Sequence, residues 1–279
     1  MEHKQTQLAN SADKKMFYTE FTIPRKRKTP RRICNPSPKL KQWQRSQLTE
    51  LNKLFLQKEL EFDLEGIFHG FVRQRNCVSG AESLVGTSAI IQMDLSNFFD
   101  TVFEKHIPID LRTMYGQNAD NFFHNEGYAY QGAPTSPILA NLALLQPLYE
   151  IKTTLTALYG KDFKLMQYAD DLNCGIYGDK LTYEDEKDII NIITKVMKAH
   201  EFEINTNKTR IKRQKFGAMR CLGINIMPTG IQATRRTLKK IRAVRGHMRF
   251  STAKSSVLGG LVTWSQLRHS AGYKQMFSI

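Results

Sequence analysis

The chain has 279 residues, of which 41% are hydrophobic and 10% aromatic, and this composition excludes disorder throughout. It has no apolar run of the roughly 20 residues that a membrane span needs, and its polar first 15 residues lack the apolar core of a secretory signal. We therefore expect a cytoplasmic protein with no membrane partner, and the net charge of +15 indicates a polyanionic one.

The positive charge lies at the two ends of the chain. Residues 1–60 hold 14 basic and 5 acidic residues, whereas residues 61–203 hold 11 and 21. Residues 204–279 hold 16 basic residues and no acidic one. Basic segments release counterions from a phosphate backbone, while a surface that only keeps a protein soluble mixes both signs. We therefore expect the ends to bind nucleic acid and the acidic middle to hold a metal-dependent site.

The first half of the chain predicts a basic hairpin, a helix and a buried strand. Residues 1–16 are expected to form a flexible tail. Alternation and the spacing of Pro residues then predict a strand over residues 17–24, a turn at 28–30, a second strand to residue 33, a helix over 40–58, a loop-rich stretch at 66–86 and a buried strand over 89–95.

The second half predicts helices, a hairpin and further strands. Apolar periodicity and turn-forming residues place a Gly- and Pro-rich loop at 131–137, one helix from 138 to about 160, a hairpin over 164–178, an amphipathic helix over 184–200, strands over 202–205 and 220–226, a turn at 228–230 and a basic helix over 235–250.

Three carboxylates lie at the ends of predicted strands. Asp94 closes the buried strand, and Asp170 and Asp171 lie at the tip of the hairpin. A pair of Asp residues in a turn is ordinary by itself, because Asp is favoured in turns. Three converging carboxylates repel one another unless divalent cations bind between them, and Mg²⁺ prefers carboxylates together with substrate phosphates. The pattern predicts two Mg²⁺ ions, with Mn²⁺ as the alternative, in an in-line displacement.

The cysteines predict no metal site. They lie far apart and form no CxxC pair, so neither a zinc site nor a disulfide framework is indicated. We interpret all four as buried, reduced thiols: Cys34, Cys77, Cys174 and Cys221.

Six strings in the sequence carry a resemblance to a known family. They are IPRKRKTPRRI, QMDLSNFFDTV, YQGAPTSPILANLAL, QYADDLNCGI, INTNKTRI and CLGINI. In this order they resemble the successive motifs of reverse transcriptases, most of all the retron and other bacterial defence-associated branch, over about residues 17–230. The resemblance implies an α+β right-hand polymerase: fingers at 17–88, a palm with an antiparallel sheet at 89–227 that includes finger insertions at about 104–130, and a helical thumb at 228–279.

The resemblance assigns roles to the aspartates and to one aromatic residue. Asp94 and Asp170 would be the principal metal ligands, with Asp171 adjacent and contributing less directly. Phe99 occupies the position of the family's steric gate, where a ring under the sugar excludes a 2′-hydroxyl. Strand alternation would point Phe98 and Phe99 to opposite faces, so we expect one of the two to pack in the core.

The resemblance also implies a set of dNTP contacts. Gln131 and Gly132 open the loop that backs the incoming nucleotide, although an ordinary structural turn would look the same. Arg31 or Arg32 would clamp the triphosphate, a role that suits the forked guanidinium. Lys208 is either a proton donor to pyrophosphate or a solvated surface lysine.

The implied primer and template contacts lie in the C-terminal half. Tyr168 is placed near the primer end, although a core tyrosine would look identical, and Gly223 lies in the turn of the primer grip. The basic thumb helix, with Arg236, Lys239 and Lys240, would follow the backbone of an RNA–DNA hybrid.

Two elements depart from the retron pattern. Residues 80–84, GAESL, stand where retron enzymes carry Asn-Ala-x-x-His, and Cys221-Leu222-Gly223 stands in place of Val-Thr-Gly. These changes favour a defence-type reverse transcriptase with its own noncoding RNA over a conventional branched-RNA retron enzyme.

The sequence therefore predicts an RNA-directed DNA polymerase that uses dNTPs and copies an associated structured noncoding RNA, in a bacterial antiphage system whose second activity comes from a separate effector protein. One alternative is a catalytically weak RNA-binding scaffold. Template-independent or protein-primed DNA synthesis is another. RNA synthesis is a third, and Phe99 argues against it.

Overall fold

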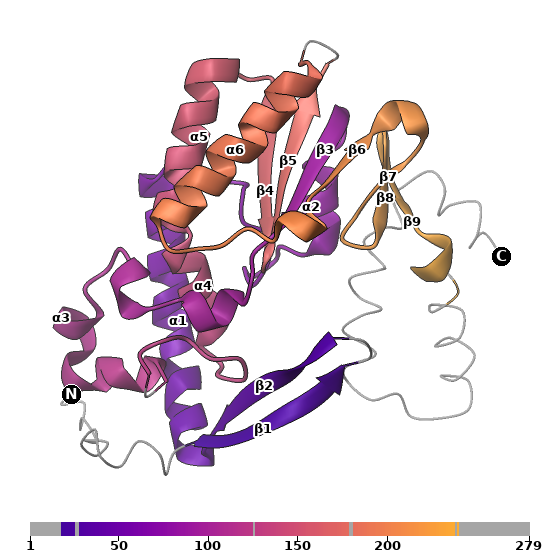
Figure 1. The fold of residues 1–279 in the computed structure, drawn as a ribbon. Coiled ribbons are helices and arrows are strands. Elements are labelled where there is room, and N and C mark those ends of the chain that lie inside the picture. The colour runs from indigo at the N-terminus through magenta and orange to yellow at the C-terminus, as the bar shows by residue number, and fades with distance from the viewer. Residues whose placement is uncertain (1–17, 26–27, 125, 179–180, 238, 240–279) are drawn as a thin grey trace. The chain divides into compact units, whose positions relative to one another are not determined.

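A computed structural model describes residues 18–25, 28–124, 126–178, 181–237 and 239 (Figure 1). The chain divides into two compact units. Unit 1 comprises Met1–Glu65, Ser96–Glu150 and Val196–Glu203, and unit 2 comprises Gly66–Leu95, Ile151–Lys195 and Ile204–Ile279. No helix in the described part of the chain is both long and apolar enough to cross a membrane. The tail expected at 1–16 lies outside the described residues.

Unit 1 begins with the expected basic hairpin, in which β1 (Tyr18–Arg25) pairs with β2 (Lys28–Pro36) in antiparallel fashion. The turn expected at 28–30 is wrong, because those residues already belong to β2. Pro30 is tolerated there because both strands of a two-stranded sheet are edge strands. A helix, α1 (Pro38–Glu61), follows with Ser37 as its cap, and it is longer at both ends than predicted.

The rest of unit 1 is helical. It contains η2 (Phe98–Thr101), η3 (Glu104–His106), α3 (Leu111–Tyr115), η4 (Gly116–Phe122), α4 (Ser136–Ala143) and the start of α5 (Leu145–Tyr159). The single helix expected from residue 138 is therefore two helices. Pro147 accounts for the break, because it offers no N–H and its ring crowds the carbonyl of the residue four positions earlier, Ala143.

Unit 2 is built on a four-stranded antiparallel sheet in the order β4-β5-β3-β6. These strands are β4 (Phe163–Tyr168), β5 (Asp171–Tyr177), β3 (Thr87–Asp94) and β6 (Arg210–Arg213), and α6 (Tyr183–Ala199) follows β5. The strands β3, β4 and β5 were expected, and β6 was not. The strand expected at 202–205 is wrong, since only Ile204 forms a bridge there, with Leu95.

A second sheet in unit 2 has the order β7-β8-β9, with β7 (Met219–Cys221), β8 (Ile224–Met227) and β9 (Gly230–Ala233). The single strand expected at 220–226 is a hairpin. Its two turn residues, Leu222 and Gly223, have φ of 50° and 79°, the signs that a tight hairpin turn requires. A short helix, α2 (Cys77–Glu82), packs against β8 and β4, and their buried side chains form one core cluster.

All four cysteines are free thiols, which confirms their interpretation as unpaired. Three are buried, but Cys77 is only half-buried, so the expectation of complete burial is wrong there. Burial raises the pKa of the Cys174 thiol to about 12, so this thiol stays neutral and packs as a small apolar group.

Candidate active site

The three aspartates lie at one end of the larger sheet in unit 2. Asp94, the last residue of β3, stands directly opposite Asp171, the first residue of β5, in the antiparallel ladder. The next backbone N–H, that of Leu95, donates to the Asp170 carbonyl oxygen at 2.9 Å. Cβ atoms of directly opposed residues lie about 5 Å apart. The strand register therefore gathers the three carboxylates, as the sequence analysis expected.

The turn that carries Asp170 is held by a neighbouring segment. Ala169 adopts a left-handed conformation with φ of 58°, which costs free energy for a residue with a side chain. The Gln167 side chain donates from Nε2 to the Ala169 carbonyl oxygen at 2.6 Å. On the other side, Phe68 forms a parallel bridge with Gln167, and a Cβ on Gly70 would lie 2.4 Å from the Ala169 nitrogen. The turn is thus fixed by contacts that leave no room for a side chain at Gly70.

The charges at this site are partly balanced by one lysine. The Asn205 N–H donates to the Asp94 carbonyl oxygen at 2.8 Å, and the short helix η5 (Thr206–Lys208) begins at the next residue. Lys208 Nζ lies 2.5 Å from Asp94 Oδ2. Burial, followed by the neighbouring Asp170 and Asp94, raises the pKa of the Asp171 carboxyl to about 6. Lys208 acts in the opposite direction on that pKa. Lys208 therefore offsets part of the negative charge of these carboxylates.

A cavity of about 410 Å³ opens beside these carboxylates. Its lining combines acidic and basic side chains, since Asp94 and Asp171 face it together with Lys208, Lys212 and Arg220. The β7–β8 turn, Leu222 and Gly223, completes the wall. A cavity of this size with a few convergent charged groups is the usual form of a small-ligand site.

The donor set fits a divalent cation of the Mg²⁺ class. Carboxylate oxygens are the hard donors that Mg²⁺ prefers, and it takes them one or two at a time together with phosphate oxygens. Burial is the main cause of the raised pKa of Asp171, and repulsion from Asp170 and Asp94 adds to it; a bound cation would relieve that repulsion. Asp94 and Asp171 face the cavity and Asp170 lies in the adjoining turn, so these three could hold such ions, and the division of ligand roles among them stays a prediction.

The two candidate arginines lie on the hairpin of unit 1, on opposite faces of β2. Arg32 is engaged: its Nη2 lies 2.8 Å from Glu20 Oε2, and its Nη1 donates to the Tyr128 hydroxyl at 3.1 Å. Arg31 is exposed. Alternation along a strand separates neighbouring side chains, so only one of the two can face a given ligand. The choice between them remains a prediction.

The loop at Gln131 and Gly132 packs on the same hairpin. The Gln131 carbonyl accepts the Cys34 N–H at 2.9 Å, and Gly132 has φ of 122°. A Cβ at Gly132 would lie 2.6 Å from the Cys34 carbonyl oxygen. The glycine is therefore required by packing within unit 1, and its contact with a nucleotide stays a prediction.

The two phenylalanines after Asp94 do not alternate along a strand. Both lie in the 3₁₀ helix η2, because the chain turns at Asn97 in a left-handed conformation with φ of 47°. Phe98 is 3% exposed and packs on the Phe202 ring, so the core interpretation applies to it. Phe99 is half-buried. The split between one core ring and one accessible ring was expected, but the argument from alternation was wrong.

The remaining predicted contacts lie in unit 2. Tyr168 is half-buried at the end of β4, opposite Asp171, and burial raises the pKa of its hydroxyl. Gly223 occupies the β7–β8 turn. Arg236 and Lys239 are exposed at the start of the expected thumb helix, whereas Lys240 and the rest of that helix lie outside the described residues.

Sequence reasoning missed the residues that support the site. Gln167 in β4 is 1% exposed, and its side-chain amide supports the turn that carries Asp170. Gly70 lies in a stretch that was interpreted only as loop-rich. The sequence signal for Gln167 was its position three residues before Asp170, whereas nothing local marks Gly70, because its constraint comes from a turn far along the chain.

The sequence of this chain is similar to those of known reverse transcriptases. A family model described as reverse transcriptase (RNA-dependent DNA polymerase) matches residues 23–226. The chain is 27% identical over 251 residues to the Retron Mx65 reverse transcriptase of Myxococcus xanthus, covering 81% of this chain and 55% of that protein. It is 24% identical to the Retron Se72 reverse transcriptase of Salmonella heidelberg, covering 72% and 52%. The chain thus spans about half the length of these curated relatives.

A solved structure supports the fold. A telomerase from Candida albicans matches with a TM-score of 0.54 at 14% identity, over 77% of this chain and 45% of that one. At this identity the likeness concerns the fold alone, and it confirms the expected α+β polymerase fold. The family match over residues 23–226 also establishes the family. This chain belongs to the reverse transcriptase family.

Proposed function

We propose that this chain is an RNA-directed DNA polymerase that joins dNTPs to a primer hydroxyl. The observation that carries the proposal is the placement of Asp94 opposite Asp171, with Asp170 in the adjoining turn, in a chain of this family. Intact, convergent carboxylates argue against an RNA-binding scaffold that has lost its chemistry.

Asp94 and Asp170 would hold two Mg²⁺ ions, with Mn²⁺ as the alternative and with Asp171 beside them. Such ions, when bound, activate the attacking hydroxyl and stabilise the leaving pyrophosphate. Lys208, which already contacts Asp94, is suited to keep a positive charge at the phosphates and to supply a proton to the departing pyrophosphate.

Further nucleotide contacts are proposed for residues of unit 1, from their match to the family's motifs. They are Phe99 at the sugar, Gln131 and Gly132 behind the nucleotide, and Arg31 or Arg32 on the triphosphate. We assign the fingers to 17–88, the palm to 89–227 and the thumb to 228–279 on the same basis. An accessible ring at position 99 supports selection of dNTPs over rNTPs.

The RNA–DNA hybrid would be held by residues of unit 2. Tyr168 and Gly223 are proposed at the primer end, and the exposed Arg236 and Lys239, with Lys240, along the hybrid backbone. A duplex of this kind is recognised mainly through its shape and phosphates, which cations serve without sequence preference.

We further propose that the template is a structured noncoding RNA and that the system acts against phage with a separate effector protein. Relatives named retron reverse transcriptases support this placement. The enzyme would not be a conventional retron one. Leu84, which stands where retrons carry His, is fully buried, and a Cβ on Gly80 would lie 3.3 Å from Met166 Sδ. Both residues serve packing here.

Primer extension tests the activity. Purified chain with an RNA template, a DNA primer, dNTPs and Mg²⁺ should give full-length DNA. Asp170→Asn should abolish the product, whereas Asp188→Asn, an exposed carboxylate on α6, should leave it unchanged. Absence of DNA with the unmodified chain under Mg²⁺ and Mn²⁺ would refute the proposal and favour the scaffold.

Sequencing of the nucleic acid that copurifies with the chain from its native locus tests the partner. One enriched noncoding RNA, together with complementary DNA that disappears in Asp170→Asn, is the expected result. Loss of protection against phage in the same variant would support the defence role, and unchanged protection would contradict it.

A further inference from the structure

A short tip between β6 and β7 carries an exposed aromatic ring beside a cation. The tip is η6 (Gln214–Phe216). Phe216 is 79% exposed, and Lys215 Nζ lies 5.3 Å from the centre of its ring. A single exposed ring is ordinary on a protein surface, so its surroundings decide what it indicates.

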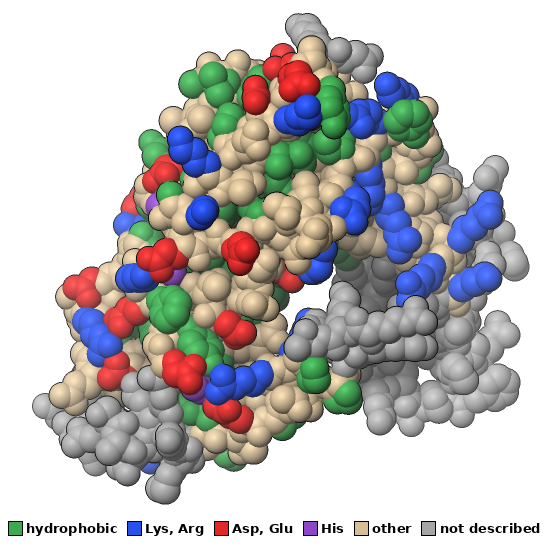
Figure 2. Space-filling model, in the orientation of Figure 1, with side chains coloured by type: hydrophobic (Ala, Val, Ile, Leu, Met, Phe, Trp, Pro, Cys, Tyr) green, Lys and Arg blue, Asp and Glu red, His purple; other side chains and the backbone are tan. Residues whose placement is uncertain are grey.

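The surroundings of this tip are positively charged. The chain has 16 basic residues and no acidic one from Ile204 onward. Within the described part, Arg210 and Arg220 are exposed on the two strands that flank the tip. Figure 2 shows Lys and Arg side chains gathered over β6–β9. Such a field attracts a phosphate backbone.

A second ring and lysine in the same unit show that the pair alone is not informative. Tyr183 at the start of α6 is 60% exposed, and Lys187 Nζ lies 4.5 Å from the centre of its ring. That lysine is bound to Glu184 at 3.0 Å, and Asp185 follows in the same helical turn. The local contacts are similar at the two sites, but the charge around them is opposite.

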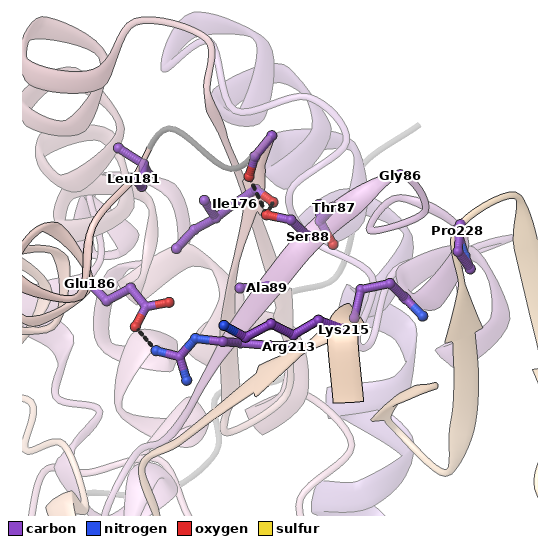
Figure 3. A pocket seen from close by; sticks show the side chains of 12 residues that line it. Gly86, Thr87, Ser88, Ala89, Ile176, Leu181, Glu186, Arg213, Lys215 and Pro228 are labelled. Atoms are coloured by element: carbon purple, nitrogen blue, oxygen red, sulfur yellow. Dashed lines mark hydrogen bonds and ion pairs between the residues drawn. The ribbon is translucent and has the colours of Figure 1, made fainter. Parts of the chain in front are cut away.

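A cavity of about 600 Å³ adjoins the tip and is lined by Gln214 and Lys215 (Figure 3). Glu186, the acidic group in its wall, is neutralised by its ion pair with Arg213. Within the described residues, Gln214 Oε1 is buried and has no hydrogen-bond partner. The Nε2 of the same side chain donates to the Gly217 carbonyl oxygen at 3.2 Å, so this amide contributes to the shape of the tip.

We propose that this tip binds an unpaired stretch of RNA, with a base stacked on Phe216 and phosphates beside Lys215. A cationic surface with an exposed ring is the combination that holds single-stranded nucleic acid, because every base offers a face for stacking. The choice of RNA rests on the proposed function. Arg213, next to the tip, pairs with Ala89 of β3, five residues before Asp94, or about 17 Å along the strand. The contact is therefore separate from the carboxylates.

The test measures binding of a labelled 20-nucleotide oligoadenylate RNA to the full chain by fluorescence anisotropy, at several salt concentrations. Phe216→Ala should weaken binding at least about fivefold, and Lys215→Ala should reduce the salt dependence by about one ion. Phe216→Trp should retain the affinity of the unmodified chain. The matched controls Tyr183→Ala and Lys187→Ala should leave it unchanged. Thermal unfolding checks that each variant is folded.

Three results would overturn the proposal. The first is an unchanged affinity in Phe216→Ala, and the second is an equal loss of affinity in Tyr183→Ala. The third is that Phe216→Ala loses as much affinity for the same sequence in a blunt RNA duplex, or as DNA, as it loses for the single-stranded RNA. Synthesis on a short preformed primer–template separates the two claims. The tip variants should keep it and Asp170→Asn should lose it. If the tip variants lose RNA affinity but the unmodified chain makes no DNA, the RNA contact is supported and only the proposed polymerase activity is refuted.

Discussion

Gly70 lies against Ala169 so closely that a Cβ on the glycine would be 2.4 Å from the Ala169 backbone nitrogen. The contact joins a segment without regular structure to the turn that carries Asp170. Real Cβ atoms do not approach a backbone atom to this distance, so any side chain at position 70 must displace the turn. This relationship gives the first prediction.

Gly70→Ala should lower kcat for DNA synthesis by about 100-fold, because a displacement near 1 Å at a catalytic group has an effect of that order. The KM for dNTPs should change less than kcat, since the proposed sugar and base contacts, Phe99, Gln131 and Gly132, belong to other segments of the chain. Steady-state primer extension measures both constants. Gly230→Ala is the control, because a Cβ there has no neighbour within 4 Å. Wild-type kcat in Gly70→Ala would show that the turn tolerates displacement.

Phe98 and Phe99 should respond differently to replacement by Ala. Phe98→Ala removes a 3% exposed ring from the core and should reduce the free energy of unfolding by about 3–5 kcal/mol. Phe99→Ala should lose less stability and should raise incorporation of rNTPs relative to dNTPs. Denaturant unfolding and paired incorporation assays measure the two effects. If Phe99→Ala keeps the sugar preference, the gate assignment fails.

Mg²⁺ should stabilise the chain against heat, because the three carboxylates repel one another without a cation. The rise in Tm should be larger in Lys208→Met, which lacks the positive charge beside Asp94, and smaller in Asp170→Asn. Lys187→Met is the control, since its lysine pairs with Glu184 on α6 and not with one of these carboxylates. Equal Mg²⁺ shifts in all four proteins would place the ion elsewhere.

His69 should make stability depend on pH. Burial lowers the pKa of its imidazole to about 4, below the unfolded value of about 6.5. The unfolded state therefore binds the proton first, so this contribution to stability is complete above pH 6.5 and is lost as the pH falls toward 4. His69→Gln should show a shallower fall over this range than the unmodified chain. Urea unfolding at several pH values measures the free energy of unfolding. An equal dependence of that free energy on pH in the two proteins would contradict the assignment.

The sequence predicted the fold class and the carboxylates, because both depend on local patterns. The apolar run before Asp94 and the hairpin around Asp170 each identify their own strand. What it missed depends on distant partners. The short β6 is a strand only because it pairs with β3, since its sequence, RIKR, is too short and too charged to show the alternation of a half-buried strand. Gly70 is constrained by Ala169, and neither neighbourhood reveals the other.

Local chemistry also explains the wrong boundaries. Pro147 divides a helix that its apolar pattern would continue, and the Leu222-Gly223 pair turns an apparent strand into a hairpin. Both signals were visible in the sequence, but the apolar periodicity around them was given more weight. The dNTP contacts of unit 1 stay predictions, since they depend on a ligand.

Asp94 and Asp171 owe their meeting to hydrogen-bonded neighbours in a ladder, and a slip of one residue would turn one of them to the opposite face of the sheet. The geometry of the chemistry is thus inherited from the most cooperative part of unit 2. Amides of β3 and β5 should exchange with solvent only on global opening, and catalytic competence should vanish at the same denaturant concentration as the sheet itself.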